Sequence, residues 1–305
     1  MGFFLETLLG GLMTGMLYAL VAIGFVLIFK ASGVFNFAQG AMVLFAALAM
    51  ARFSEWIPKW LGMAPGFVTL ALALIVSVII MIGVAWLIER LALRHLVNQE
   101  PITLLMATLG IAYLLDGLGP MIFGSAVYSI DVGMPKDPVF ILENVFDGGV
   151  LVSKEDLYSA CIAAVLVALL SLFFQKTKTG RALRAVADDH QAAQSIGIPL
   201  SRMWVIVWSV AGVVALVVGV IWGSKIGVQF SLSLVALKAL PVVILGGLTS
   251  LPGAIVGGLI IGVVESLSGF YLPEGFKDVA AYIVVLIMLM VKPNGLFGEK
   301  LRKKV

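Results

Sequence analysis

Charged residues are scarce in this 305-residue chain: they make up 12% of it, against 61% hydrophobic residues. The mean hydropathy of +1.12 is spread along almost the whole length rather than gathered in one anchor. An ordinary soluble domain cannot bury so much apolar surface. The formal net charge is only +3, and no basic run is interleaved with aromatic residues, so no nucleic-acid partner is expected. The chain is therefore expected to lie largely in lipid.

Cysteine and histidine are almost absent, which removes several kinds of chemistry. Cys161 lies in the apolar stretch 157–174 with no cysteine or histidine at ligand spacing, so neither a disulfide nor a metal site is expected. We expect it to be a small apolar packing residue. His95 and His190 lie in polar stretches, and the sequence contains no Gly-x-Ser-x-Gly or His-Glu-x-x-His motif, which argues against an intramembrane enzyme.

Long apolar runs are what the sequence does contain. A helix needs roughly 20 apolar residues to cross a bilayer, so the sequence predicts an all-α bundle of eight or nine membrane-spanning helices. The first run has no basic residue before it and is too long for a signal-peptide core, so it is expected to be a span. The second, seventh and ninth runs are short for a full crossing. The predicted segments are 5–29, 35–51, 66–88, 102–123, 157–174, 204–223, 234–247, 253–270 and 278–291.

Lysine and arginine are distributed unevenly among the loops, and this predicts the orientation, because basic residues are retained on the cytoplasmic side. The acidic loop 124–156 is expected to be periplasmic, which with nine crossings puts the N-terminus outside and the C-terminus inside. Trp56 and Trp60 then lie at the membrane interface between two segments. The basic clusters are Arg90 and Arg94, then Lys176, Lys178, Arg181, Arg184 and Arg202, then Lys292, Lys300, Arg302, Lys303 and Lys304. The loop's acidic residues are Asp131, Asp137, Glu143, Asp147, Glu155 and Asp156.

Similar polar, glycine-containing interruptions recur in both halves of the sequence. One includes Gly33 to Gly40, and the other includes Gly246 to Gly253. If segments one to four correspond to segments six to nine, the offset of five crossings gives halves of opposite topology. Inverted repeats with broken helices are typical of transporters. Ordinary packing of glycine-rich membrane helices is the alternative interpretation.

The stretch 175–203 is the most informative polar segment. From about Arg181 its apolar residues recur at helical spacing, and Gly197 followed by Pro199 is a helix-stop signal, so a short amphipathic helix is predicted. Such a helix needs either lipid headgroups or a protein groove. The apolar positions are Leu183, Val186, Ala187 and Ala193; Arg181, Arg184, Asp188 and Asp189 are expected on the other side.

Within this helix, Gln191-Ala192-Ala193 followed by Gly197 resembles the EAA loop of ABC importer permeases, which docks into a groove on the ATPase. Gln191 stands where that pattern has Glu. Adjacent alanines let a partner approach closely, and glycine permits a sharp turn. Further motifs occur in order: Tyr18-Ala19-Leu20 with Gly24, Asn36-Phe37-Ala38-Gln39-Gly40, Gly180-Arg181-Ala182-Leu183-Arg184-Ala185, Leu245-Gly246-Gly247 with Ser250 and Pro252-Gly253-Ala254, and Pro293-Asn294-Gly295-Leu296-Phe297-Gly298.

Together these motifs resemble the branched-chain amino acid ABC transporter permease family, in its shorter subunit type, over nearly the whole chain. Many family members carry His and an acidic residue in the second motif. This sequence has Gln39 and Ala41 there, so a role that depends on a charge is not carried over.

The resemblance implies a single transmembrane permease domain over 1–305, in the bacterial inner membrane, forming half of a pathway for branched-chain or related small amino acids. The implied partners are a second, related permease in a heterodimer, two cytoplasmic ATPases and a periplasmic binding protein. The sequence has no Gly-x-x-x-x-Gly-Lys-Ser/Thr loop, so ATP is expected to be bound by a partner, with no cofactor or catalysis in this chain. The implied coupling residues are Arg181, Arg184, Asp188, Gln191, Ala192, Ala193 and Gly197.

Polar residues within the apolar segments are candidates for the pathway. Asn36 and Gln39 lie in a helix break, with hydrogen bonding between helices as the alternative. Asp116, Lys238 and Glu265 are ionisable residues at membrane depth, which are costly and suggest function; an Asp116–Lys238 ion pair is one structural alternative. A self-contained secondary transporter or channel is the alternative function.

Overall fold

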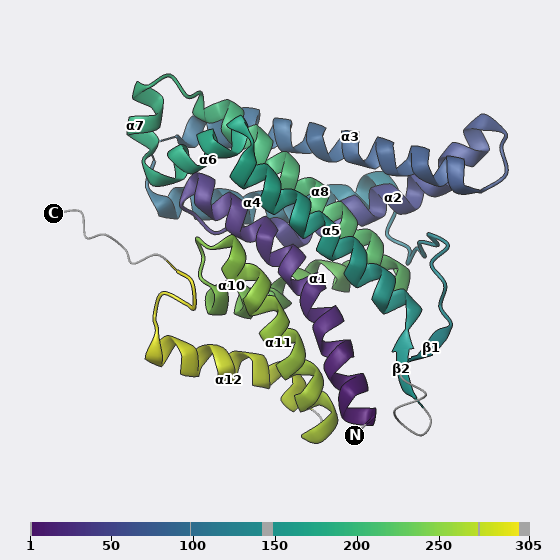
Figure 1. Ribbon diagram of the computed structural model, residues 1–305. Helices are drawn as coiled ribbons and strands as arrows, with labels where there is room; N and C mark the ends of the chain where they lie inside the picture. Colours follow the sequence, from purple (N-terminus) through teal and green to yellow (C-terminus); the bar gives the residue numbers. More distant parts are fainter. Residues whose placement is uncertain (1, 98, 142–148, 274, 299–305) are drawn as a thin grey trace. The chain divides into compact units, whose positions relative to one another are not determined.

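The computed structural model describes residues 2–97, 99–141, 149–273 and 275–298. In this part of the chain the regular structure is helical apart from one two-stranded hairpin, which confirms the predicted all-α bundle (Figure 1). The long helices are α1 (Gly2–Ser32), α2 (Gln39–Leu61), α3 (Phe67–Leu91), α4 (Pro101–Phe123), α5 (Lys154–Lys176), α8 (Leu200–Ile226) and α11 (Leu251–Tyr271). The shorter helices are η1 (Leu93–Leu96), α6 (Lys178–Asp188), α7 (His190–Ser195), η2 (Phe230–Leu234), α9 (Val235–Lys238), α10 (Leu240–Gly246) and α12 (Phe276–Val291).

Seven of the described helices, α1 to α5 with α8 and α11, are long and apolar enough to cross a membrane. The prediction of a short second segment at 35–51 is wrong, because α2 starts at Gln39 and continues for 23 residues. The apolar run stops at Arg52, but Arg52 Nη1 lies 2.6 Å from Glu55 Oε2 and its guanidinium lies 4.9 Å from the centre of the Trp56 ring. These contacts let the helix continue past its charges. Trp56 and Trp60 consequently stack within α2 and do not lie in a loop.

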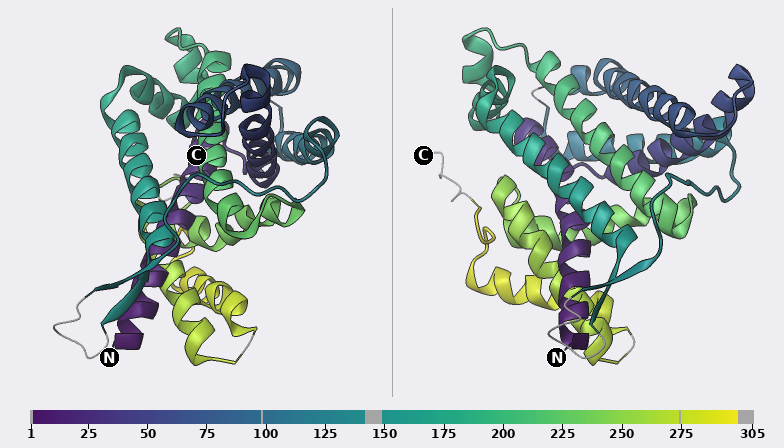
Figure 2. Two further views of the ribbon diagram at one scale, coloured as in Figure 1. Left: turned by 90° about the vertical axis from the view of Figure 1, so that its right-hand side faces the viewer. Right: turned by 45° about the vertical axis from the view of Figure 1, so that its right-hand side comes forward.

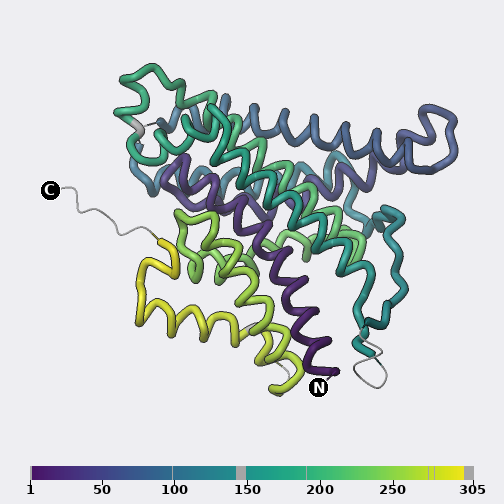
Figure 3. Tube along the Cα trace, viewed as in Figure 1, coloured from purple at the N-terminus to yellow at the C-terminus, as the bar shows by residue number. Residues whose placement is uncertain are grey.

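Both predicted interruptions are confirmed. Residues 33–38 separate α1 from α2, and residues 247–250 separate α10 from α11, as the trace in Figure 3 shows. The predicted segment 234–247 is itself divided among η2, α9 and α10, and the apolar part of α12, Val279–Val291, is also short. The number and direction of the crossings, and the inverted repeat, stay predictions.

Contacts along the chain divide it into two compact units. The first unit comprises Met1–Val26, Gly133–Ser171 and Lys238–Val305, and the second comprises Leu27–Val132 and Leu172–Leu237. The unit boundaries fall within α1 and α5, so both helices contribute residues to each unit.

The second unit is built around α2 and α8. α8 packs against α2 and α3, and α2 packs against α3 and α4. Every residue of α2 from Gln39 to Ala51 is buried. In contrast, most of the apolar surface of α3 and α4 is exposed, as expected for helices whose outer sides meet lipid.

The first unit depends on glycine for its closest helix crossing. The N-terminal half of α1 lies beside α11 (Figure 1), where a Cβ added at Gly15 would lie 2.5 Å from the carbonyl oxygen of Gly258. A Cβ at Gly262 would overlap the backbone of Gly11 and Gly15. Only residues without side chains permit this approach, a common device in membrane helix pairs.

The C-terminal motif packs against the break between α10 and α11. The backbone N–H of Leu296 donates to the carbonyl oxygen of Leu245 at 2.8 Å, and that of Phe297 donates to Gly246 at 3.1 Å. Two motifs that are about 50 residues apart in the sequence therefore form one structural feature of the first unit.

The loop 124–156 contains strands β1 (Pro138–Ile141) and β2 (Val150–Ser153), which pair antiparallel with Pro138 opposite Ser153 (Figure 2). The Leu151 N–H donates to Glu6 Oε1 of α1 at 2.7 Å, which ties the hairpin to the start of α1. Glu143 and Asp147 of the acidic loop lie outside the described residues, as do Lys300, Arg302, Lys303 and Lys304 of the last basic cluster.

Cys161 is exposed on α5, so the prediction of a packing role within the chain is wrong. In an apolar membrane helix a small side chain is tolerated on a lipid-facing side as well as in a core, and the sequence does not distinguish the two.

Candidate functional site: the coupling segment and the polar break

The segment 175–203 forms two helices, α6 and α7, where one was predicted. Thr177 caps α6 by accepting a hydrogen bond from the Gly180 N–H at 2.9 Å. Asp189 interrupts the helix and caps α7, since its Oδ1 accepts from the N–H groups of Gln191 and Ala192 at 2.8 and 3.0 Å. An aspartate at this position favours a new helix start over continuation. The start of α7 is thereby set by a side chain that is expected, from the sequence, on the charged side of a single helix.

Burial separates the coupling candidates into two groups. Leu183, Val186 and Ala193 are buried, which confirms three of the four predicted apolar positions. Ala192 is exposed although Ala193, its neighbour, is buried, so only Ala192 is available to a partner. Gly197 adopts a φ of +87°, as expected for the predicted sharp turn. The exposed candidates are Arg181, Arg184, Asp188, Gln191, Ala192 and Gly197.

The polar break at 33–38 is buried within the second unit. Asn36 and Gln39 are both fully inaccessible. The side chain of Asn36 accepts from the Ala38 N–H at 3.0 Å and donates to Gln39 Oε1 at 3.4 Å, and Gln39 Nε2 donates to the Ala211 carbonyl of α8 at 3.4 Å. In this conformation the two side chains hold the break and join it to α8. That is the helix-to-helix alternative considered for these residues.

Further residues around the break were not identified from the sequence. Thr108 of α4 accepts from the Phe37 N–H at 3.3 Å and lies 3.4 Å from the Phe35 carbonyl. At Gly40 any Cβ would overlap the carbonyl oxygen of Ser233. A threonine in an apolar helix is common and carries no signal of its partner, so sequence reasoning had no means to select Thr108.

Two further hydrogen bonds join the first turns of α8 to other helices. Glu89 at the end of α3 is 4% exposed, and its carboxylate accepts a hydrogen bond from the Ser201 hydroxyl. The indole Nε1–H of Trp204 donates to the Ala31 carbonyl, in the last turn of α1, at 3.1 Å. A buried carboxylate at a helix N-terminus is favoured by the unpaired N–H groups there. The sequence does offer one signal for Glu89, which is an acidic residue directly after the long apolar run 66–88.

The ionisable candidates lie in different units. Lys238 Nζ is 3.3 Å from Glu265 Oε1 within the first unit, so the structure shows an ion pair of Lys238 with Glu265 rather than the alternative with Asp116. In the second unit, Oδ1 of Asp116 is buried without a hydrogen-bond partner among the described residues.

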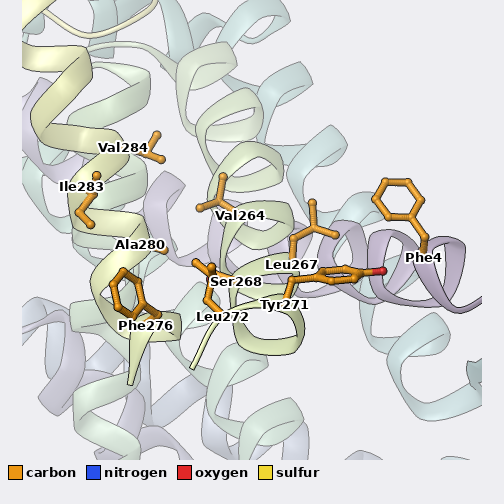
Figure 4. Close-up of a pocket in the computed structure, with 10 residues that line it drawn as sticks. All are labelled: Phe4, Val264, Leu267, Ser268, Tyr271, Leu272, Phe276, Ala280, Ile283 and Val284. Atoms are coloured by element: carbon orange, nitrogen blue, oxygen red, sulfur yellow. The ribbon is translucent and has the colours of Figure 1, made fainter. Parts of the chain in front are cut away.

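A groove of about 720 Å³ lies along α11 and α12 in the first unit (Figure 4). Figure 4 shows that its walls are apolar side chains, with the hydroxyl groups of Ser268 and Tyr271 as polar exceptions. An amino acid carries two charged groups that require polar partners when they are desolvated. The groove includes none of the predicted pathway residues, and its chemistry suits hydrocarbon better than an amino acid.

Long apolar helices with two interruptions, together with an amphipathic helix pair joined to α8, define a multi-pass membrane protein of the transporter type. Sequence comparison gives the particular family. The chain matches the family described as branched-chain amino acid transport system / permease component over residues 7–291, and it belongs to that family. The family resemblance drawn from the motifs is confirmed.

Curated relatives align over almost the full length of the chain. The high-affinity branched-chain amino acid transport system permease protein LivH of Salmonella typhimurium is 30% identical, over 99% of this chain and 98% of its own. The corresponding protein BraD of Pseudomonas aeruginosa is 27% identical, with the same coverage. Among solved structures, PsaBC from Streptococcus pneumoniae in complex with Fab aligns over 95% of this chain and 94% of its own at a TM-score of 0.49 and 14% identity.

Proposed function

We propose that this chain is the permease subunit of an ABC importer for branched-chain or related small amino acids and forms half of the translocation pathway. It pairs with a second, related permease, binds two cytoplasmic ATPases and receives substrate from a periplasmic binding protein. Its membrane is the bacterial inner membrane, with the N-terminus outside and the C-terminus inside.

The exposed side of α6 and α7 is the observation that carries the proposal. Leu183, Val186 and Ala193 are buried against the chain itself, whereas the charged and polar side of the two helices is exposed in the part of the chain that the structure describes. A four-residue connection, 196–199, leads from α7 directly into α8. A partner that moves α7 therefore acts on a long membrane helix, which is what energy input from a separate ATPase requires.

The substrate class comes from the relatives, which are described as branched-chain amino acid permeases. The binding protein delivers leucine, isoleucine, valine or a similar small amino acid, and the pathway requires few polar contacts for such a side chain. The ATPases supply the nucleotide site, since this sequence has no phosphate-binding loop.

Reconstitution in liposomes tests the proposal. The chain with its permease partner and ATPases is expected to take up radiolabelled leucine only when ATP and the binding protein are supplied. The chain alone, at the same protein density, is expected to give no uptake above empty liposomes. Uptake by the chain alone at the rate of the full complex would support a secondary transporter or channel and overturn the proposal.

A further inference from the structure

α8 is held to the rest of the second unit along one face. Ser201, Trp204 and Ala211 make the three hydrogen bonds to Glu89, Ala31 and Gln39 described above. Spacings of three and seven residues place these positions on the same side of a helix, over roughly 15 Å of its length. These contacts therefore extend from the start of α8, which follows α7, to a point about three turns further along the same face.

Two of these hydrogen bonds lie on opposite sides of the polar break. Ala31 belongs to the last turn of α1, before residues 33–38, and Gln39 is the first residue of α2, after them. Trp204 and Ala211 thus join α8 to both ends of the break. Both indole and amide partners are buried, where a lost hydrogen bond is not replaced by water.

The start of α8 is also coupled closely to α7. The Ile198 N–H donates to the Ala193 carbonyl at 3.0 Å, and Pro199, whose ring restricts φ, precedes Leu200, the first residue of α8. The connection is therefore conformationally restricted, and a displacement of α7 also displaces the first turn of α8.

We propose that α8 transmits movement of α6 and α7 to the break at 33–38, and that Ser201 and Trp204 are the positioning residues of this transmission. This inference rests on the proposed function. When α7 moves, α8 shifts as a rigid rod, and its hydrogen bonds to Ala31 and Gln39 carry both ends of the break with it. The middle of the break is hydrogen-bonded to Thr108 of α4, so the bent segment that contains Asn36 changes shape as its ends move.

The test uses the whole reconstituted complex and measures the number of amino acids taken up per ATP hydrolysed. Trp204→Phe keeps an aromatic ring but removes the N–H donor, and Ser201→Ala removes the hydroxyl donor. Each is expected to lower the ratio roughly two- to tenfold, the range that corresponds to one buried hydrogen bond. ATP hydrolysis stimulated by the binding protein is expected to continue.

Matched controls separate transmission from general damage. Trp208→Phe makes the same change one turn further along α8, at a buried tryptophan for which the described part of the chain shows no hydrogen bond, and should keep the wild-type ratio. Ser201→Thr retains the hydroxyl and should restore coupling. The inference is overturned if Trp204→Phe and Trp208→Phe give equal ratios, or if Ser201→Ala couples as well as Ser201→Thr.

The two levels of the hypothesis fail differently. If the wild-type complex shows no ATP-dependent uptake, the proposed function is wrong. If the wild-type complex transports and either donor-removing variant couples as well as its control, only the role of α8 is wrong. If Trp204→Phe does not fold, the Ser201 pair gives the decision, because serine, threonine and alanine differ little in volume at the helix start.

Discussion

Lys238 and Glu265 are ionisable residues of apolar segments, and their charged groups lie 3.3 Å apart in the first unit. The Glu265 side chain is 6% exposed and that of Lys238 is 44% exposed. Loss of the ion pair therefore costs more at the buried Glu265 carboxylate than at the half-exposed Lys238 ammonium, because an exposed charge without its partner is still solvated.

This asymmetry predicts the effect of breaking the pair. Lys238→Met leaves the Glu265 carboxylate without this partner and is expected to lower the stability of the protein in detergent by about 1–2 kcal/mol. Adding Glu265→Gln removes the buried charge and is expected to recover part of the loss. Thermal unfolding of the single and double variants measures both effects.

The same variants distinguish a structural pair from a pathway residue. If the pair is structural, the double variant should regain uptake together with stability. A double variant no more stable than Lys238→Met would contradict the dependence of Glu265 on Lys238. Recovery of stability without uptake would indicate that a charge is needed on the pathway.

Several polar residues could be chosen from the sequence, but their contacts could not. Asn36 and Gln39 stand out as polar residues in an apolar context, yet the acceptor for Gln39 is a backbone carbonyl 172 residues away. Every residue has such a carbonyl, so no pattern identifies the one that is used. Glu89 and Trp204 were missed for a related reason: their positions at the ends of apolar runs are where membrane proteins ordinarily place such residues.

Among the elements, the helix pair α6 and α7 offers the sharpest contrast between neighbouring residues. Ala192 is exposed and Ala193 is 2% exposed, though both belong to the same motif. A bulky residue at Ala192 alters only what can approach from outside, whereas one at Ala193 must displace the protein's own side chains.

Ala192→Trp is therefore expected to reduce copurification of the ATPase at least severalfold and leave the thermal stability of the isolated chain unchanged. Ala193→Trp is expected to lower that stability, because overpacking a filled site costs about 1–3 kcal/mol. Affinity purification followed by thermal unfolding measures both. Wild-type copurification by a stable Ala192→Trp variant would show that the ATPase does not meet this side of α7.

The crossing of α1 and α11 gives a second prediction at the level of elements. Gly15→Ala places a methyl group 2.5 Å from a backbone oxygen of α11, whereas at Gly10, in the same helix, a methyl group would meet nothing within 4 Å. Gly15→Ala is expected to lower the melting temperature in detergent, and Gly10→Ala to leave it unchanged or raise it slightly, since alanine favours helix. Equal melting temperatures would mean that the crossing is looser than described.

Apolar length located most of the long helices but not all their ends. The second segment was cut short at Arg52 because composition treats each charge separately, whereas the helix continues through an Arg52–Glu55 pair flanked by aromatic rings. The division of 175–203 into two helices was missed because Asp189 suits both an exposed helix position and a cap. The two breaks were found because glycine and polar residues interrupt otherwise continuous apolar runs.

For the whole molecule, the distribution of basic residues predicts which side of the membrane each loop occupies. Alkaline phosphatase inserted between residues 142 and 148 should be active, and green fluorescent protein fused at the C-terminus should fluoresce, since the first requires the periplasm and the second the cytoplasm. Fusions placed after α3 should behave like the C-terminal one. Phosphatase activity at the C-terminus would show that the orientation is the reverse of the one proposed. The segment 175–203 would then be periplasmic and could not contact an ATPase.

Cys161 provides a native site for attaching a spectroscopic label. Because it is the single cysteine and is exposed on α5, one membrane-permeable spin label attaches at a known place in the first unit without removal of any native thiol. Ile196, between α7 and α8, is 73% exposed and would accept a second label in the second unit. Distances between the two probes, recorded with and without nucleotide, would report the movement of one unit relative to the other during the transport cycle.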